Sequence, residues 1–235
     1  MNLPAAFLDR PLAHRGLHDP RDARLENCRA AFDAAVRAGY GIELDVQLTR
    51  DGSAVVFHDA TLDRLAGRGG AIAEMTVAEL SQVTLTGSGD RIETLRGILD
   101  GIPPDTPVLV EMKSNGTDPA RLAVAVAHAV AGRKNVAVMS FDPACVIEMA
   151  RRAPQTPRGL TTPSTDGAEI AGYEAAGACF VAHDRADLAH PDLARLRREG
   201  AAILSWTVRS TAEERAARIV ADTVIFEDYV PIRPA

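Results

Sequence analysis

Two carboxylates in one short segment could bind a metal ion together. Glu43 and Asp45 lie two residues apart in the segment IELDV at 42–46, and such side chains point to the same face of a strand. The rest of the segment is apolar, so this face is predicted to be buried. Two adjacent buried carboxylates repel each other, so either one is protonated or a cation lies between them. Hard oxygen ligands favour Mg²⁺ or Ca²⁺; the alternative is a solvated edge strand with two surface acids.

The segment VLVEMK at 108–113 repeats this pattern with one acidic and one basic side chain. Glu111 and Lys113 share a face at the C-terminal end of a strongly apolar strand. Charged residues at this end of a barrel strand are typical of catalytic sites. Glu111 would complete a site of three carboxylates, and Lys113 could neutralise an anion on a substrate. The alternative is a structural Glu–Lys pair where the strand ends.

Two histidines lie at the ends of predicted strands. His14 follows Pro-Leu-Ala, and His58 ends the short segment AVVFH. Each histidine alone is more often structural, but beside a carboxylate-bound cation the two could divide the work of a general base and a general acid. Arg15, next to His14, could hold a phosphate or a carboxylate with two hydrogen bonds. Together these residues predict cleavage of a phosphoester, with either histidine as the base.

Composition indicates a globular protein that does not bind nucleic acid. The chain has 235 residues, 46% of them hydrophobic, which is enough for one large domain or two small ones. Its net charge of −6 argues against a nucleic-acid partner. It has no run of about 18 apolar residues that could span a membrane, and its N-terminus lacks the features of a signal peptide. We therefore expect a cytoplasmic protein with a small-molecule substrate and no stable membrane insertion.

Short apolar segments alternate with helical patterns along the chain. The predicted strands cover residues 11–15, 41–48, 107–113, 136–141, 157–161, 178–183, 201–208 and 223–227. The predicted helices cover residues 27–38, 118–131, 143–152, 166–176, 191–199 and 211–219. Eight strands separated by helices predict a (β/α)8 TIM-like barrel, which is an α/β fold. The alternative, an open doubly wound sheet, usually has a glycine-rich loop after its first strand, and this sequence has none there.

One segment interrupts the alternation. Residues 49–106 are too long for a single connection between a strand and a helix. They contain a further extended segment at 54–58 and short helices near 76–82 and 94–100. We expect a single domain over residues 1–235, in which 49–106 form an insertion after the second strand, folded over the mouth of the barrel.

Several segments in this order are shared with a known family. They are AHRG (13–16), ENCRAAF (26–32), GIELDVQLTRDGSAVVFHDATLDRLAGRGG (41–70), VLVEMK (108–113), MSFDP (139–143), LSWTV (204–208) and VIFEDY (224–229). With these segments the sequence resembles the glycerophosphodiester phosphodiesterase family. The resemblance implies a TIM-like barrel with a small insertion after its second strand. It also implies metal-dependent hydrolysis of a glycerophosphodiester to glycerol 3-phosphate and an alcohol, a reaction of lipid and glycerol metabolism.

The resemblance further implies roles for individual residues. The acid–base pair would be His14 and His58, and the ligands of the divalent cation would be Glu43, Asp45 and Glu111. Contacts to the phosphate would come from Arg15 and Lys113, and Glu26 and Asn27 would lie in a loop near the active site. Trp206 would form a wall of the substrate pocket.

The implied reaction begins with an attack from within the substrate. One histidine takes the proton of the free 2-hydroxyl of the glycerol, and the resulting oxygen attacks phosphorus. The other histidine protonates the departing alcohol, and water then opens the cyclic phosphate with the two roles reversed. A tethered nucleophile has a large effective concentration, which favours this route.

The sequence departs from the family's usual pattern at several positions near the site. Cys28 stands where the family usually has Thr or Ser, and it is a weaker helix cap than a hydroxyl. Arg209 stands in place of a common Asn, and Glu227 in place of a common Thr. We expect Arg209 and Glu227 to influence which leaving group fits, without changing the type of reaction.

Two other functions compete with this one. A related barrel phospholipase D acting on lysophospholipids would need exposed aromatics or a basic patch at a lipid surface, but aromatic residues make up 4% of the chain and its net charge is negative. A non-catalytic barrel that binds a phosphate-containing ligand would be favoured if a histidine or carboxylate of the set were missing, and none is. The metal site requires that the histidines and carboxylates converge on one cleft.

Overall fold

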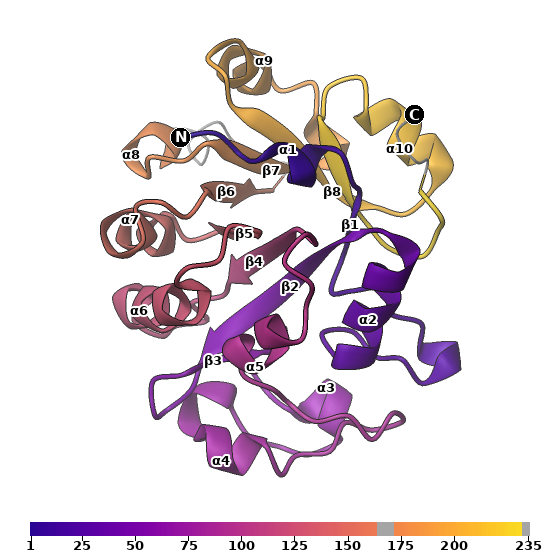
Figure 1. Ribbon diagram of the computed structural model, residues 1–235, viewed down its shortest axis with the longest axis vertical. Helices are drawn as coiled ribbons and strands as arrows, with labels where there is room; N and C mark the ends of the chain where they lie inside the picture. Colours follow the sequence, from indigo (N-terminus) through magenta and orange to yellow (C-terminus); the bar gives the residue numbers. More distant parts are fainter. Residues whose placement is uncertain (164–171, 232–235) are drawn as a thin grey trace.

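A closed barrel of parallel strands forms the centre of the protein (Figure 1). The computed structural model describes residues 1–163 and 172–231, and in these ranges eight parallel strands run in the order β1-β9-β8-β7-β6-β5-β4-β2 and close by pairing β2 with β1. These strands are β1 (Leu12–Ala13), β2 (Gly41–Leu48), β4 (Val108–Met112), β5 (Val136–Ser140), β6 (Arg158–Thr162), β7 (Phe180–Asp184), β8 (Ala202–Val208) and β9 (Thr223–Phe226). The predicted (β/α)8 barrel is confirmed.

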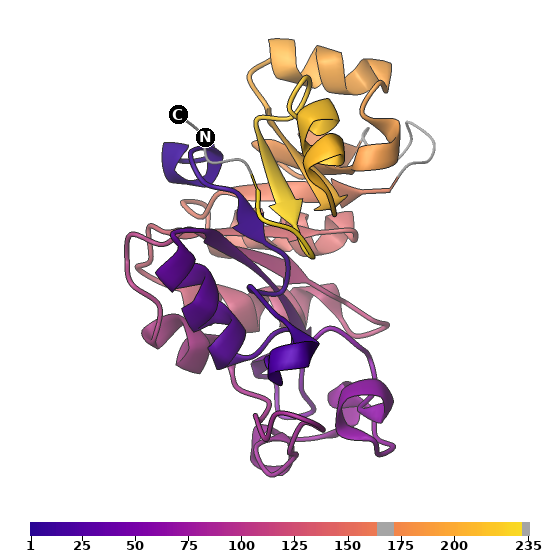
Figure 2. The ribbon, with the colours of Figure 1, turned by 90° about the vertical axis from the view of Figure 1, so that its right-hand side faces the viewer.

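Helices between the strands pack around the outside of the barrel (Figures 1 and 2). They are α2 (Arg29–Ala38), α6 (Pro119–Val130), α7 (Pro143–Arg152), α8 (Gly172–Ala175), α9 (Pro191–Arg198) and α10 (Thr211–Ala217). Asp118, Asp142 and Ser210 each accept a hydrogen bond from a backbone N–H of the first turn that follows, as helix-capping side chains do. Cys28 precedes α2 without such a bond. Of the predicted helix 166–176, residues 166–171 lie outside the described residues.

Several short helical turns were not predicted from the sequence. They are α1 (Ala5–Leu8), α3 (Asp63–Ala66) and the 3₁₀ turns Pro20–Asp22, Ile72–Glu74 and Arg185–Asp187. Turns of three or four residues carry too little hydrophobic periodicity to be recognised in a sequence. Across residues 1–163 and 172–231, no helix has the length and apolar character needed to cross a membrane.

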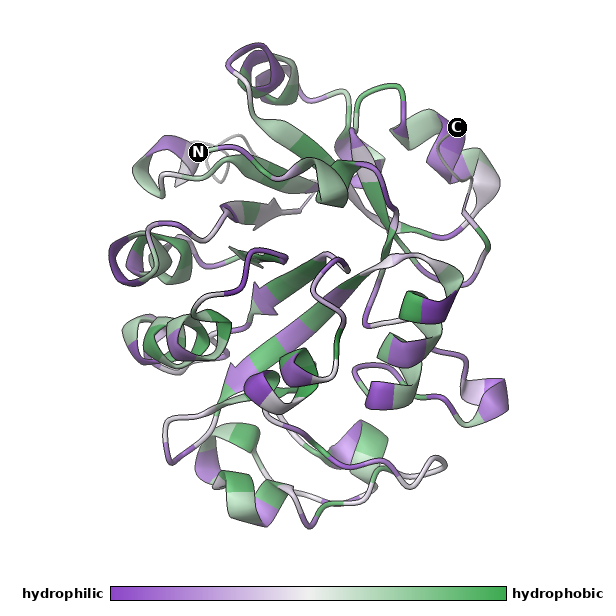
Figure 3. Cartoon of the chain, in the orientation of Figure 1, coloured by the Kyte–Doolittle hydropathy of each residue, from purple (hydrophilic) through white to green (hydrophobic). Residues whose placement is uncertain are grey.

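Alternating side chains on the strands divide the apolar residues into two layers. On β4, Leu109 packs in a cluster with Leu12 and Phe180, whereas Val108 and Val110 belong to the cluster formed with the outer helices. The parallel strands are therefore apolar on both faces, as expected when helices cover the outside of a barrel. Figure 3 shows hydrophilic bands that interrupt this apolar pattern on β2.

The close approach of β6 and β7 inside the barrel requires a glycine. A Cβ atom on Gly159 would lie 2.3 Å from the Phe180 ring, which is fully buried. We expect Gly159→Ala to lower the free energy of unfolding by about 1–3 kcal/mol, because the ring has no free space to move into. Urea denaturation measures the change. Gly69→Ala is the control, since a Cβ there meets nothing within 4 Å; equal losses in the two variants would contradict the steric argument.

Strand β1 ends earlier than predicted. The predicted strand included His14 and Arg15, but the regular pairing stops at Ala13. Arg15 has φ +55° and Gly16 has φ +80°, so the chain turns sharply here. The Gly16 N–H donates to the Ala13 carbonyl at 3.1 Å and to the Glu43 carbonyl at 3.2 Å. His14 and Arg15 therefore lie on a turn at the carboxyl end of β1.

The segment between β2 and β4 has a small apolar core of its own. It holds β3 (Ala54–Val56), α3, α4 (Val77–Leu80) and α5 (Leu95–Asp100), which occupy the lower end of Figures 1 and 2. Strand β3 pairs antiparallel with the carboxyl end of β2. Val55 packs with Phe57 and Leu62 in the separate core of this segment, while the neighbouring Val56 packs in the core around the barrel. The alternation of β3 therefore ties the segment to the barrel.

Candidate active site

Three carboxylates converge inside the barrel at the carboxyl ends of β2 and β4. Each of the three residues offers one carboxylate oxygen, and these three oxygens lie within 4.8 Å of one another; the residues are Glu43, Asp45 and Glu111. Asp45 and Glu111 are directly paired in the register of the two strands, and all three residues are buried. The alternative of two surface acids on a solvated edge strand is therefore wrong. The shared face that the strand alternation predicted points into the barrel.

Two basic side chains partly balance this negative charge. Lys113 Nζ lies 2.6 Å from Glu111 Oε1 and 3.2 Å from Asp45 Oδ1. Arg15 donates its backbone N–H to Glu43 Oε2 at 2.9 Å, and its Nε lies 3.3 Å from Asp45 Oδ2. The two residues expected to contact phosphate thus lie against the carboxylates.

The three carboxylates differ in their tendency to hold a proton. Burial, with repulsion from Asp45 and Glu111, raises the pKa of Glu43 well above its usual value. Burial also raises the pKa of Glu111 to about 7, against the opposing effect of Lys113. Burial acts in the same direction on Asp45, but the charges of Lys113 and Arg15 outweigh it and lower the pKa of Asp45. Asp45 is therefore the most strongly ionised member of the cluster.

The oxygen atoms of this cluster fit a divalent cation. Within the described residues, Glu43 Oε1 and Asp45 Oδ1 are buried without a hydrogen-bond partner. Lys113 lies near Asp45 Oδ1, but not in the geometry of a hydrogen bond. Buried carboxylate oxygens normally have a partner, and Mg²⁺ and Ca²⁺ are bound by such oxygens together with water. The donor set therefore suits either ion.

Asn27 and Glu26 hold the cluster and Arg15 in place. Asn27 donates Nδ2–H to Asp45 Oδ2 at 2.8 Å and accepts the Asp45 backbone N–H on Oδ1 at 3.1 Å. Glu26 Oε1 accepts a hydrogen bond from Arg15 Nη1 at 2.8 Å. Arg64 donates two further hydrogen bonds to the Glu26 carboxylate. Both loop residues expected near the site are thus in it, and both orient other side chains.

Each histidine is held by a carboxylate through its Nδ1 atom. His14 Nδ1 lies 2.5 Å from Glu227 Oε2, and His58 Nδ1 lies 2.7 Å from Asp59 Oδ1. Burial lowers the pKa of His58, against the opposing effects of Asp45 and Asp59. Since both Nδ1 atoms are engaged, the Nε2 atoms remain for contact with a substrate.

An arginine in turn holds each of these two carboxylates. Arg64 donates Nε–H to Asp59 Oδ2 at 2.7 Å, and this bond is the main reason that the pKa of Asp59 is lowered to about 2. Arg209 donates Nε–H to Glu227 Oε1 at 2.7 Å. Asp59 and Arg64 were not predicted as site residues from the sequence, although both lie in the segment 41–70 that carries the resemblance.

Trp206 lies near the carboxyl end of β8, and Phe141, which follows β5, lies between it and Lys113. Its Nε1–H donates to the Ala182 carbonyl at 2.9 Å. Its ring meets the ring of Phe141 edge to face, with the centroids 5.3 Å apart, and Lys113 Nζ lies 6.0 Å from the Phe141 centroid. Phe141 is 44% exposed and was not selected from the sequence. The signal that could have identified Phe141 is an aromatic residue directly after a buried strand.

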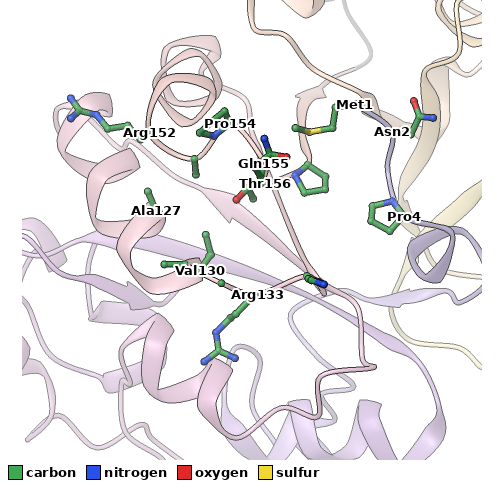
Figure 4. Close-up of a pocket in the computed structure, with 15 residues that line it drawn as sticks. Met1, Asn2, Pro4, Ala127, Val130, Arg133, Arg152, Pro154, Gln155 and Thr156 are labelled. Atoms are coloured by element: carbon green, nitrogen blue, oxygen red, sulfur yellow. The ribbon is translucent and has the colours of Figure 1, made fainter.

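A separate pocket lies at the opposite end of the barrel, where the helices return to the strands (Figure 4). Its volume is about 830 Å³, and the N-terminal residues and the loops before β5 and β6 line it. Its basic side chains include Arg133 and Arg152, which pair with Asp100 and Glu148. None of the predicted site residues lines this pocket, so we assign the chemistry to the carboxyl ends of the strands.

The sequence pattern of the glycerophosphoryl diester phosphodiesterase family matches residues 14–230. The chain belongs to this family. A Mycobacterium tuberculosis protein named "Probable glycerophosphodiester phosphodiesterase 1" is 30% identical over 84% of this chain and 81% of its own length. The resemblance drawn from the sequence is thereby confirmed.

Solved structures of other proteins share this fold. A glycerophosphodiester phosphodiesterase from Thermotoga maritima is 29% identical, with a TM-score of 0.73 and 92% of each chain covered. A phosphodiesterase from Oleispira antarctica, solved with the product sn-glycerol-3-phosphate, is 21% identical, with a TM-score of 0.79 and 95% of each chain covered. The second of these likenesses bears on the fold alone.

Proposed function

We propose that this chain hydrolyses glycerophosphodiesters to glycerol 3-phosphate and an alcohol, with a divalent cation and two histidines. The observation that carries the proposal is the buried cluster of Glu43, Asp45 and Glu111, with two carboxylate oxygens that lack a partner in the described residues. Two histidines with engaged Nδ1 atoms accompany the cluster at the barrel mouth. The family membership and the names of the Mycobacterium tuberculosis and Thermotoga maritima relatives support this substrate class.

The proposed site separates the stabilisation of charge from the transfer of protons. A divalent cation held by the three carboxylates would withdraw electrons from the phosphate oxygens and stabilise the charge of the transition state. Arg15 and Lys113 add positive charge at the same place, and Glu26 and Asn27 fix the positions of Arg15 and Asp45. Such preorganised charge needs little rearrangement during the reaction.

The histidines transfer the protons. One takes the proton of the 2-hydroxyl of the glycerol, whose oxygen forms a bond to phosphorus as the bond to the alcohol breaks. The other gives its proton to the departing alcohol oxygen. In the second stage, the histidine that acted as the acid takes a proton from water. The water oxygen forms a bond to phosphorus as the bond between phosphorus and the 2-oxygen breaks. The first histidine returns its proton to the 2-oxygen, so both rings regain their starting states.

The test of this function is release of glycerol 3-phosphate from defined substrates. Glycerophosphocholine, glycerophosphoethanolamine and glycerophosphoglycerol are assayed for this product, and lysophosphatidylcholine is assayed for lysophosphatidic acid, each with Mg²⁺, with Ca²⁺ and with EDTA. We expect release from at least one glycerophosphodiester with a cation, and none with EDTA. Activity on lysophosphatidylcholine alone would favour the phospholipase D alternative. No release from any substrate by the folded protein would contradict the proposal.

Arg64 is expected to support catalysis without touching the substrate. It joins Asp59, the partner of His58, to Glu26, the partner of Arg15. Arg64→Met should lower kcat about tenfold, which is typical when an outer partner of an active site is lost. Steady-state kinetics measure the change.

The control for Arg64→Met is Arg50→Met. Arg50 is also an exposed arginine of the segment between β2 and β4, and it pairs with Glu79 at 3.0 Å. This variant should keep the wild-type kcat. If both variants lost activity equally, the effect would come from the stability of the segment and not from the site.

A further inference from the structure

The closure of the barrel brings Glu227 to His14. His14 donates its backbone N–H to the Phe226 carbonyl at 2.8 Å, and Glu227 donates its own to the Val208 carbonyl at 3.0 Å. Ala13 and Phe226 are paired in the register of β1 and β9. The positions of the two side chains therefore follow from strand pairing across the closure, and not from a flexible loop.

The ionised form of Glu227 is strongly favoured. Its side chain is 13% exposed. Its Oε2 atom lies 2.5 Å from His14 Nδ1 and 3.7 Å from His18 Nε2, and its Oε1 atom lies 2.5 Å from Arg209 Nη2. Burial alone would raise the pKa of Glu227, but the hydrogen bond from His14, the nearby His18 ring and the charge of Arg209 lower it. An ionised carboxylate only accepts hydrogen bonds. The proton between the two side chains must therefore be on His14 Nδ1.

We propose that Glu227 is a positioning residue for His14 and that Arg209 holds Glu227 in place. Glu227 keeps the proton of the neutral ring on Nδ1, so that Nε2 presents the lone pair that accepts a proton during the reaction. Among the described residues, the contact of Nδ1 with Glu227 is the only hydrogen bond that the His14 ring makes. The proposal rests on the proposed function, because it takes His14 as one of the two proton-transferring residues.

Arg209 and Glu227 were expected to influence which leaving group fits, and the proposal gives them a second role in holding His14. In the structure they bind each other, and Glu227 binds His14. Glu227, directly after β9, thus gives His14 a charged partner across the closure of the barrel. His58 is held in the same way by Asp59 and Arg64, which gives the two histidines matching supports.

Two measurements test the proposal. Nitrogen-15 NMR of histidine-labelled protein reports which ring nitrogen of His14 is protonated, and steady-state kinetics on glycerophosphocholine separate kcat from KM. We expect Nδ1 protonated and Nε2 unprotonated in the neutral wild-type ring. In enzymes with a catalytic histidine held by a carboxylate, an amide in place of that carboxylate gives the wrong tautomer and lowers kcat by up to about 10⁴-fold. Glu227→Gln should therefore change the tautomer and lower kcat about 10²-fold, with KM within about twofold.

Arg209 provides a second variant in case Glu227→Gln fails to fold. Its side chain is 49% exposed, so Arg209→Met leaves no buried gap. This variant should lower kcat about tenfold by loosening Glu227, and Arg209→Lys should restore most of the loss. Glu148→Gln, which disrupts an ion pair on α7, is the matched control and should keep the wild-type kcat.

The outcomes separate this proposal from the proposed function. A proton on Nε2 and not on Nδ1 in the neutral wild-type ring, or a kcat within about twofold of wild type in Glu227→Gln, would overturn the positioning role. Loss of kcat in Glu227→Gln with the tautomer unchanged would also contradict it. If the wild type released no product from any glycerophosphodiester, the proposed function would fail. The NMR spectra of wild type and Glu227→Gln would still show whether Glu227 determines which nitrogen of His14 is protonated.

Discussion

Alanine in place of either His14 or His58 is expected to lower kcat by about 10³-fold while the fold is kept. Each ring has its Nδ1 engaged by a carboxylate, and its other nitrogen is left for proton transfer. Burial lowers the pKa of His58, which keeps this ring neutral and able to accept a proton near pH 7. The side chains of His14 and His58 are 14% and 30% exposed, so their removal leaves no closed cavity in the core.

The measurement is kcat at saturating substrate and cation, with circular dichroism to verify the fold. His128→Ala is the control, because His128 is exposed on α6 and it is its backbone carbonyl, which the substitution keeps, that accepts a hydrogen bond from Arg96. It should behave as wild type. A residual kcat above about one-tenth of wild type in either active-site variant would count against that histidine as an acid or base.

The carboxylate cluster could be predicted from the sequence because its geometry is mostly local. Glu43 and Asp45 share a face since they lie two residues apart on β2, and Lys113 directly follows the end of β4, two residues after Glu111. Parallel barrel strands end at the same rim, so two such segments had to meet there. The pairing of Asp45 with Glu111 needed one more fact, the register of β2 against β4, which the sequence does not contain.

The supports of the histidines could not be predicted, because they depend on the closure of the barrel and on turns. Glu227 is separated from His14 by almost the whole chain, and only the pairing of β1 with β9 brings them together. Glu26 lies in a loop and Arg64 on the short helix α3, and only the folded chain brings their side chains together. Arg15 adopts φ +55°, a conformation that favours glycine, so the sequence suggested a longer strand at this point.

The cation response should depend on Glu43. We expect Glu43→Gln to raise the cation concentration for half-maximal activity by about tenfold or more, because glutamine keeps the volume but loses the charge of a ligand. Activity is measured against Mg²⁺ and against Ca²⁺ after treatment with EDTA. The rise of the unfolding midpoint on adding cation gives a readout independent of turnover. Glu148→Gln is the control, and an unchanged cation response would remove Glu43 from the proposed ligands.

Without a cation, the same substitution is expected to reduce the loss of stability at high pH. The pKa of Glu43 is raised well above 4.5 by burial and by its acidic neighbours. As the pH rises above about 4.5, the unfolded chain loses this proton while the folded protein keeps it, so stability falls until the raised pKa is passed. Glu111, whose pKa burial raises to about 7, acts in the same direction.

The measurement is the unfolding midpoint in EDTA between about pH 5 and pH 8. Glu43→Gln has no proton to lose at this position, so its midpoint should fall less than that of wild type over this range. Equal losses in the two proteins would contradict a buried, protonated Glu43. Adding a cation should raise the wild-type midpoint again at the high end of this pH range. The cation then takes the place of the Glu43 proton, because the three carboxylates share it as a positive partner. The charge that destabilises the empty cluster is thus the charge that would bind the ion.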